Sequence, residues 1–129
     1  MAKLKKSEQE WRDQLDEDTF RVTREKGTEY PGTGQFLHHN EKGQYLCVCC
    51  SEVLFVSENK FDAGCGWPSF DKSIEGKVEY NRDLSHGMIR TEIICSNCDS
   101  HLGHVFDDGP TETGNRYCVN SVSLTFKSG

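Results

Sequence analysis

The sequence predicts a single, mainly antiparallel β domain with a small helical cover at its N-terminus. Three observations support this prediction: several short segments alternate apolar and polar residues at a period of two, glycine-rich turns separate them, and helical patterns lie before residue 27. Because 129 residues suit one modest core, we expect one domain over residues 1–129, with residues 1–20 forming the cover.

The predicted cover consists of two short helices. Ser7 and Glu10 have the spacing of a capping box, and the helix that it opens carries Trp11 and Leu15 on one face. A second helix of one or two turns is expected over about residues 16–26, because a glycine follows as a stop signal.

Strand patterns fill the rest of the chain. Apolar or alternating runs occupy residues 45–48, 53–56, 77–80, 88–94 and 116–126. Loops rich in glycine separate these runs. The short runs and the turns between them are typical of an antiparallel β domain.

Composition and charge argue against several classes of function. A net charge of −6 does not suit a nucleic-acid-binding surface, which would be basic. The basic residues that follow Met1 precede polar rather than apolar residues, and no apolar run is long enough to span a bilayer. We therefore expect a cytoplasmic protein without a nucleic-acid or membrane partner.

The seven cysteines of such a chain are expected to bind metal or to react as thiols. Cys47 and Cys50 form one CxxC pair, and Cys95 and Cys98 form a second. Two such pairs complete a tetrahedral shell of four thiolates, so we predict one structural zinc ion per chain with no open coordination position. A single CxxC pair could instead be redox-active. Cys49, inside the first pair, is interpreted as a bystander.

Cys118 is the candidate nucleophile. In a strand, Arg116, Cys118 and Asn120 share one face. A guanidinium beside a thiol favours the reactive thiolate, and an amide offers hydrogen bonds to a polar substrate. An ordinary half-buried strand cysteine has the same local sequence, so this segment alone leaves both interpretations open.

Three further residue types could assist this thiol. Cys65 lies between two glycines in a loop, where it meets the requirements of a resolving cysteine. Trp67 offers an aromatic wall close by, although a core tryptophan is the plain alternative. His101 and His104 suit proton donation or hydrogen bonding near neutral pH, while metal ligation and a structural role remain open.

Four segments, taken together and in order, resemble the B-type methionine sulfoxide reductases, a family specific for the R epimer at sulfur. The similarity runs from about residue 22 to residue 126, includes both CxxC pairs, and is strongest over residues 61–70, 85–92, 101–110 and 116–121. The resemblance implies a pair of antiparallel sheets in a tent-like arrangement with short N-terminal helices. It also implies the activity of a peptide-methionine (R)-S-oxide reductase.

The resemblance further implies a role for each matching residue. Cys118 matches the catalytic cysteine, and Cys65 matches the recycling cysteine that forms a disulfide with it. Trp67 matches the aromatic residue that holds the sulfoxide methyl group. The remaining pocket and catalytic positions are matched by His101, His104, Arg116 and Asn120, with Asp108 a weaker candidate for substrate binding.

The same resemblance implies partners and a biological role. The implied substrates are oxidised proteins or peptides that contain methionine-R-sulfoxide, and the implied reductant is thioredoxin. Protein repair under oxidative stress, through a redox-active disulfide, is the implied role, and we expect the protein to act as a monomer. Two positions depart from the family pattern: Ser51 replaces a glycine, and Cys49 adds a thiol inside the first CxxC pair.

Two functions from other classes fit parts of the sequence. A zinc-ribbon binding module without catalysis needs only the four paired cysteines. A zinc hydrolase would use His101 and His104 together with an open coordination position.

Overall fold

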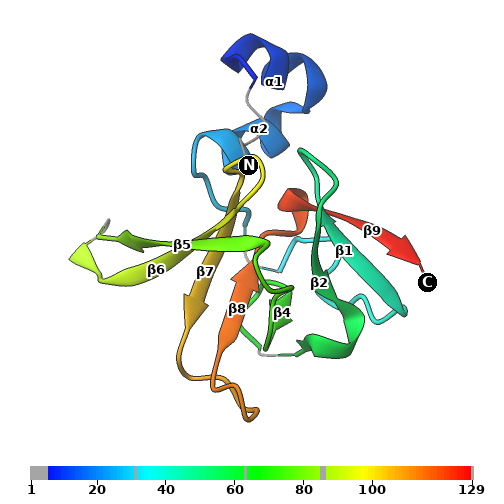
Figure 1. Cartoon of the computed structure of the whole chain (residues 1–129), viewed down its shortest axis with the longest axis vertical. Helices are drawn as coiled ribbons and strands as arrows, with labels where there is room; N and C mark the ends of the chain where they lie inside the picture. The colour runs from blue at the N-terminus through cyan, green and yellow to red at the C-terminus, as the bar shows by residue number, and fades with distance from the viewer. Residues whose placement is uncertain (1–5, 31, 63, 85–86, 129) are drawn as a thin grey trace.

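Two short helices cover one end of two antiparallel β-sheets in the computed structural model (Figure 1). The structure describes residues 6–30, 32–62, 64–84 and 87–128. The mainly β fold with two sheets and an N-terminal helical cover is therefore confirmed. Residues 1–5 of the expected cover, and Ala63, Ser85 and His86 of the family-like segments, lie outside the described residues.

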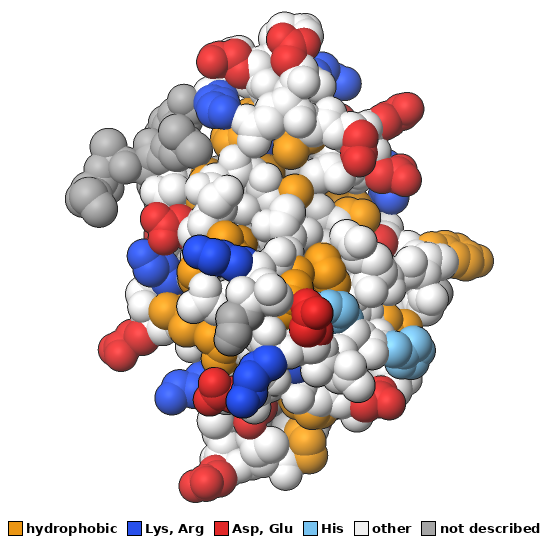
Figure 2. All heavy atoms as spheres, turned by 90° about the vertical axis from the view of Figure 1, so that its right-hand side faces the viewer, with side chains coloured by type: hydrophobic (Ala, Val, Ile, Leu, Met, Phe, Trp, Pro, Cys, Tyr) orange, Lys and Arg blue, Asp and Glu red, His pale blue; other side chains and the backbone are white. Residues whose placement is uncertain are grey.

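Both predicted helices are present. Helix α1 spans Glu8–Gln14 and begins with the predicted capping box, in which the Glu10 backbone N–H donates to Ser7 Oγ at 3.2 Å and the Ser7 N–H donates to Glu10 Oε1 at 3.0 Å. Helix α2 spans Glu17–Arg24, so the cover extends beyond the expected boundary at residue 20. Acidic side chains gather over this helical end of the molecule (Figure 2).

The first sheet has three strands in the order β2-β1-β9. Strand β1 spans Gly43–Cys47, β2 spans Val53–Val56 and β9 spans Leu124–Ser128. Strand β1 pairs antiparallel with both neighbours. The C-terminal strand thereby closes against the first strand of the chain, which brings the end of the sequence back to the first CxxC pair.

The second sheet has six strands in the order β3-β4-β8-β7-β6-β5. In that order the strands span Lys60–Phe61, Ser69–Phe70, Arg116–Val119, His101–Phe106, Arg90–Cys95 and Val78–Asp83. All neighbouring pairs are antiparallel. Strand β8 lies inside this sheet, between β4 and β7, and carries the candidate nucleophile.

One strand prediction was wrong, and three strands, β3, β4 and β7, were not predicted. The alternating run over residues 116–126 is not one strand: β8 ends at Val119, a 3-10 turn spans Ser121–Ser123, and β9 then joins the other sheet. The break follows Asn120, whose backbone N–H still bonds to Leu102 of β7 and whose side chain bonds to Leu102 and to Glu29. Strand β7 was not predicted, because its two histidines and its glycine do not resemble a strand.

Aromatic side chains join the two sheets. Phe55 of β2 stacks on Phe70 of β4 with ring centroids 4.4 Å apart, and Tyr45 of β1 meets the same ring edge-on at 5.2 Å. All three side chains are fully buried. No helix in the described part of the chain is long and apolar enough to cross a membrane.

Candidate active site and metal site

The four cysteines of the two CxxC pairs lie together, and their sulfur atoms are all within 4.8 Å of one another. The sulfurs of Cys47 and Cys98 are 3.6 Å apart, as are those of Cys50 and Cys95. Tetrahedral zinc with Zn–S bonds of about 2.3 Å places its sulfurs about 3.8 Å apart. The observed spacing therefore suits a four-thiolate metal ion.

Each CxxC pair follows the end of a strand and turns in the same way. The N–H of Ser51 donates to the carbonyl of Cys47 at 2.8 Å, and the N–H of Asp99 donates to the carbonyl of Cys95 at 2.9 Å. Ser51 and Asp99 both have a left-handed backbone, with φ of 68° and 63°. The glycine that Ser51 replaces would adopt this conformation without strain.

Cys49 does not belong to the four-sulfur group. Its side chain is buried, and its carbonyl accepts a hydrogen bond from Gln14 of α1 at 2.9 Å. The Arg24 guanidinium of α2 donates in the same way to the carbonyl of Cys98 at 2.8 Å. The helical cover is thus fastened to both CxxC turns.

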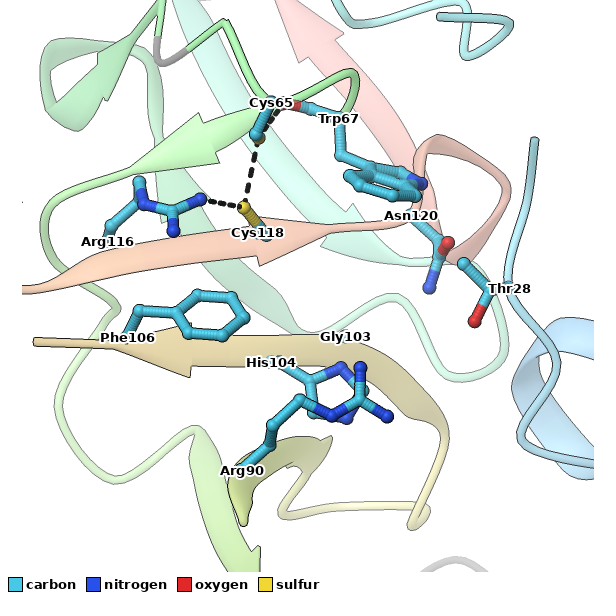
Figure 3. A pocket seen from close by; sticks show the side chains of 10 residues that line it. All are labelled: Thr28, Cys65, Trp67, Arg90, Gly103, His104, Phe106, Arg116, Cys118 and Asn120. Atoms are coloured by element: carbon cyan, nitrogen blue, oxygen red, sulfur yellow. Dashed lines mark hydrogen bonds between the residues drawn. The ribbon is translucent and has the colours of Figure 1, made fainter. Parts of the chain in front are cut away.

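A second site lies on the six-stranded sheet, in a cavity of about 310 Å³. Strand β8 forms its floor, the loop before β4 borders one side, and strands β6 and β7 border the other (Figure 3). The cavity is lined by Thr28, Cys65, Trp67, Arg90, Gly103, His104, Phe106, Arg116, Cys118 and Asn120. Six of the predicted site residues are therefore brought together here: Cys65, Trp67, His104, Arg116, Cys118 and Asn120.

Arg116 and Cys118 share one face of β8, as the strand period predicted (Figure 3). Nη1 of Arg116 donates to the Cys118 sulfur at 3.0 Å. The other nitrogens of this guanidinium, Nε and Nη2, bind both carboxylate oxygens of Asp108 at 2.8 and 3.1 Å. The ring of Phe106 lies 4.5 Å from the guanidinium carbon. Asp108 itself does not line the cavity; it holds the arginine that touches the thiol.

Cys65 faces Cys118 from the opposite side of the cavity, with the two sulfurs 3.0 Å apart. Gly64 and Gly66, on either side of Cys65, have φ of 67° and 91°, values that favour glycine. The hydroxyl of Ser69 lies 3.3 Å from the Cys65 sulfur. The loop therefore places a second thiol directly against the buried one.

The pKa values of the two cavity thiols are shifted in opposite directions. The hydrogen bond from the Cys118 thiol lowers the pKa of Cys65 to about 5, although burial opposes this shift. The pKa of Cys118 is raised, first because its proton is held in that bond and second by burial, while Arg116 acts in the opposite direction. With the sulfurs 3.0 Å apart, the pKa of Cys65 is thus lowered and that of Cys118 raised, and Arg116 acts to lower the pKa of Cys118.

Trp67 and Asn120 form the far wall of the cavity. The indole N–H of Trp67 donates to the carbonyl of Glu29 at 3.1 Å. Asn120 is only 3% exposed; its Oδ1 accepts from the Glu29 N–H at 3.0 Å and its Nδ2 donates to the Leu102 carbonyl at 3.0 Å. Most of the hydrogen-bonding capacity of this amide is therefore used within the protein.

The two predicted histidines differ in position. His104 lines the cavity and donates from Nε2 to Asp83 at 2.7 Å. His101 does not line this cavity; it is 4% exposed and donates from Nδ1 to Glu92 at 2.6 Å. An irregularity in the β6–β7 register puts both rings on one face, with centroids 5.7 Å apart. Burial lowers the pKa of His104, although its bond to Asp83 raises it. Neither histidine belongs to the described four-sulfur group.

Comparison with known proteins identifies the family. The model of the SelR domain matches residues 15–128. The chain belongs to this family. Three proteins named peptide methionine sulfoxide reductase MsrB are similar over 129 residues: one from Hahella chejuensis is 61% identical, one from Chromohalobacter salexigens 58% and one from Acinetobacter baylyi 54%. These matches cover 99%, 98% and 99% of this chain and 93%, 97% and 93% of the relatives. The resemblance stated from the sequence is thereby confirmed.

Several residues of this SelR-domain site were missed by sequence reasoning. Arg90 and Thr28 line the cavity, and Asp83 holds His104. Arg90 is bound at 3.3 Å to the same carboxylate. Asp83 lies opposite Arg90 in the pairing of β5 with β6, beyond the strand predicted over residues 77–80, and Thr28 lies in a loop with no motif that indicates a site.

Proposed function

We propose that this protein reduces the R epimer of methionine sulfoxide in oxidised proteins and peptides to methionine. One arrangement supports this proposal above all: a buried thiol at the floor of a cavity, with a guanidinium nitrogen and a second thiol each 3.0 Å from its sulfur. This arrangement supplies a nucleophile, a cation to stabilise its anion and a partner for a disulfide.

In the first step, the Cys118 thiolate attacks the sulfoxide sulfur. The proton of the Cys118 thiol passes to Cys65, whose sulfur lies 3.0 Å away, and Arg116 stabilises the anion left on Cys118. The sulfoxide oxygen is transferred to Cys118, so that methionine leaves and Cys118 becomes a sulfenic acid. The substrate is reduced by two electrons, and Cys118 is oxidised by two.

His104 is the histidine that we assign to the sulfoxide oxygen. It lines the cavity, and its Nε2–H is committed to Asp83. In the imidazolium form Nδ1 also carries a proton, which passes to the sulfoxide oxygen and leaves a neutral ring that solvent reprotonates. Charge develops on the oxygen during attack, and a donor aimed at it contributes about 3–4 kcal/mol in comparable sites. His101, bound to Glu92 behind it, is assigned a supporting role.

In the second step, the Cys65 thiol attacks the sulfenic sulfur of Cys118, a disulfide forms, and water leaves. The sulfurs already lie 3.0 Å apart, so only a short approach is needed. An external dithiol then reduces the disulfide and restores both thiols; we propose thioredoxin for this role.

Trp67 and Asn120 are proposed to bind the substrate. The ring of Trp67 provides an apolar and aromatic surface for the sulfoxide methyl group. Asn120 retains one Nδ2 hydrogen that is not used in its bond to Leu102. Asp108 acts through Arg116 rather than by contact with the substrate.

Cys47, Cys50, Cys95 and Cys98 would hold one zinc ion per chain. Such an ion would stabilise the fold and take no part in the reaction, because the four cysteine sulfurs would fill its coordination shell. We further propose a single domain over residues 1–129 that acts as a monomer. A cytoplasmic location is proposed because reduced thiols for metal binding persist in a reducing compartment.

The test is incubation of the purified protein with separated R and S epimers of a methionine sulfoxide peptide, with dithiothreitol as reductant. We expect conversion of the R epimer only. Conversion of neither epimer, or of the S epimer alone, would refute the proposed function.

A further inference from the structure

Glu29 is a buried acidic residue that does not line the cavity. It is 5% exposed, and its Oε1 accepts a hydrogen bond from the backbone N–H of Val122 at 3.0 Å. Its Oε2 is inaccessible to solvent and has no hydrogen-bond partner among the described residues. Burial raises the pKa of this carboxyl group, and hydrogen bonds from the N–H groups of Ser121 and Val122 oppose the shift.

The backbone of the same residue holds two walls of the cavity. Its carbonyl accepts the indole N–H of Trp67 at 3.1 Å, and its N–H donates to Oδ1 of Asn120 at 3.0 Å. Trp67 comes from the loop before β4, and Asn120 follows β8. A single residue in the segment between α2 and β1 therefore binds two side chains from distant parts of the sequence, Trp67 and Asn120, which both line the cavity.

The side chain of Glu29 helps to fasten this segment to the turn after β8, together with the bond from the Phe36 N–H to Ser121 Oγ at 3.2 Å. Its bond to Val122 ties residue 29 to the 3-10 turn Ser121–Ser123, directly beside Asn120. Gly34 closes the other side of the carboxyl group: a Cβ at this position would collide with Oε2 of Glu29 and with the hydroxyl of Ser121. The carboxyl group is thus confined on two sides.

We propose that Glu29 is a positioning residue for the sulfoxide site, whose buried carboxyl group sets the places of Trp67 and Asn120. The inference rests on the proposed function. A residue that only stabilised the fold could be apolar, because burying a carboxyl group with an unpartnered oxygen is unfavourable. What the carboxyl provides is an acceptor for Val122 at a fixed distance from the cavity wall.

The experiment compares Glu29→Ala with the conservative variant Glu29→Gln, which keeps an oxygen for Val122. Gly34→Ala serves as a second probe, because it displaces the carboxyl group without changing its chemistry. Asp18→Asn is the matched control. Asp18 and Glu29 both line a second cavity, which lies beside the turn at Ser121 and Val122, but the Asp18 side chain is 82% exposed.

Two readouts separate this inference from the proposed function. The first is steady-state reduction of an R-sulfoxide peptide with dithiothreitol. The second is ¹⁹F NMR of protein labelled with 5-fluorotryptophan, which needs no activity; the Trp67 signal is assigned with Trp67→Phe, and Trp11 in the helical cover is the internal reference.

In Glu29→Ala and Gly34→Ala we expect KM to rise about tenfold with a smaller change in kcat, because misplacement of binding groups near 1 Å has large effects. The Trp67 resonance should shift while that of Trp11 stays in place. Glu29→Gln should have a KM within about twofold of the wild-type value and an unshifted Trp67 resonance. Asp18→Asn should match the wild type in both measurements.

Unchanged KM and an unchanged Trp67 resonance in folded Glu29→Ala would overturn the inference, as would Glu29→Gln behaving like Glu29→Ala. If the wild type reduces no sulfoxide, the proposed function fails, and the NMR comparison still decides whether Glu29 positions Trp67.

Discussion

The two cysteine groups of this protein differ in what surrounds their sulfur atoms. At the CxxC turns, four sulfurs lie within 4.8 Å of one another, and the backbone on both sides is fixed by matching turns. In the cavity, two sulfurs lie 3.0 Å apart beside a guanidinium and open space. The first surrounding suits a metal ion, and the second suits redox chemistry.

The comparison shows that reactivity is set by neighbours rather than by the thiol itself. A cation held by four sulfurs has no free coordination position for a substrate. Cys118 has one cationic neighbour, Arg116, which Asp108 keeps in place with two hydrogen bonds. Cys65 sits on a loop between glycines, so it can approach Cys118.

The largest effect is expected from removal of a metal ligand. Cys95→Ser should lose the zinc and most of the folded structure, because binding free energies of structural zinc are about 10–16 kcal/mol in small peptides and exceed the stability of a typical domain. Metal analysis and circular dichroism measure both losses. A soluble, active Cys95→Ser protein without metal would remove the distinction between the two cysteine groups.

Removal of the nucleophile should have a different result. Cys118→Ser should lower sulfoxide reduction by about 10³-fold or more with any reductant, because a neutral hydroxyl is a poor nucleophile. The zinc content and the melting temperature should stay close to those of the wild type. Substantial remaining activity would show that another group attacks the sulfoxide.

The proton shared by the cavity pair gives a pH-dependent prediction. Because the pKa of Cys65 is lowered to about 5, its thiolate is populated above that pH. Alkylation of Cys65 by iodoacetamide should therefore be nearly independent of pH above about pH 6 in the wild type. In Cys118→Ala the donor is gone, so the midpoint should move upward by more than about one unit.

Peptide mapping of alkylated cysteines as a function of pH measures these midpoints. A wild-type rate that continues to rise up to about pH 9 would contradict the lowered pKa. The cysteines of the CxxC turns should remain unmodified throughout, which provides the internal comparison between the two groups.

The smallest effect concerns Ser51, which has a left-handed backbone at the first CxxC turn. Ser51→Gly should stabilise the protein by up to about 1 kcal/mol, since a left-handed conformation costs other residues roughly 1–2 kcal/mol and glycine loses part of this gain through its entropy. Ser51→Ala is the control, because it removes the hydroxyl and keeps the strain. Equal melting temperatures for both variants would show that the hydroxyl, rather than φ, matters.

Part of this account could be predicted from the sequence. Local signals found the capping box at Ser7 and Glu10 and most strands, because spacing and alternation depend only on neighbouring residues. The break at Asn120 was not predictable, since it depends on bonds to Glu29 and Leu102, which are 91 and 18 residues away. An alternating pattern continues through the break and conceals it.

In the site, too, some positions follow from neighbouring residues and others depend on contacts with distant parts of the chain. The positions of Arg116 and Cys118 follow from the period of one strand, so sequence spacing sufficed. The placement of His101 and His104 on one face depends on an irregularity in the pairing of β6 with β7, which no local pattern encodes. Asp83 reaches His104 only through the folded sheet.

The most direct test of the central claim is the identity of the disulfide that forms after one turnover. The protein is mixed with excess R-sulfoxide peptide in the absence of reductant, and its cysteine-containing peptides are mapped by mass spectrometry. We predict one bond, between Cys65 and Cys118, with the CxxC cysteines and Cys49 unmodified. Cys65→Ser should release about one methionine per protein and form no disulfide. A Cys49–Cys118 peptide, or a bond involving a cysteine of the CxxC turns, would contradict the account.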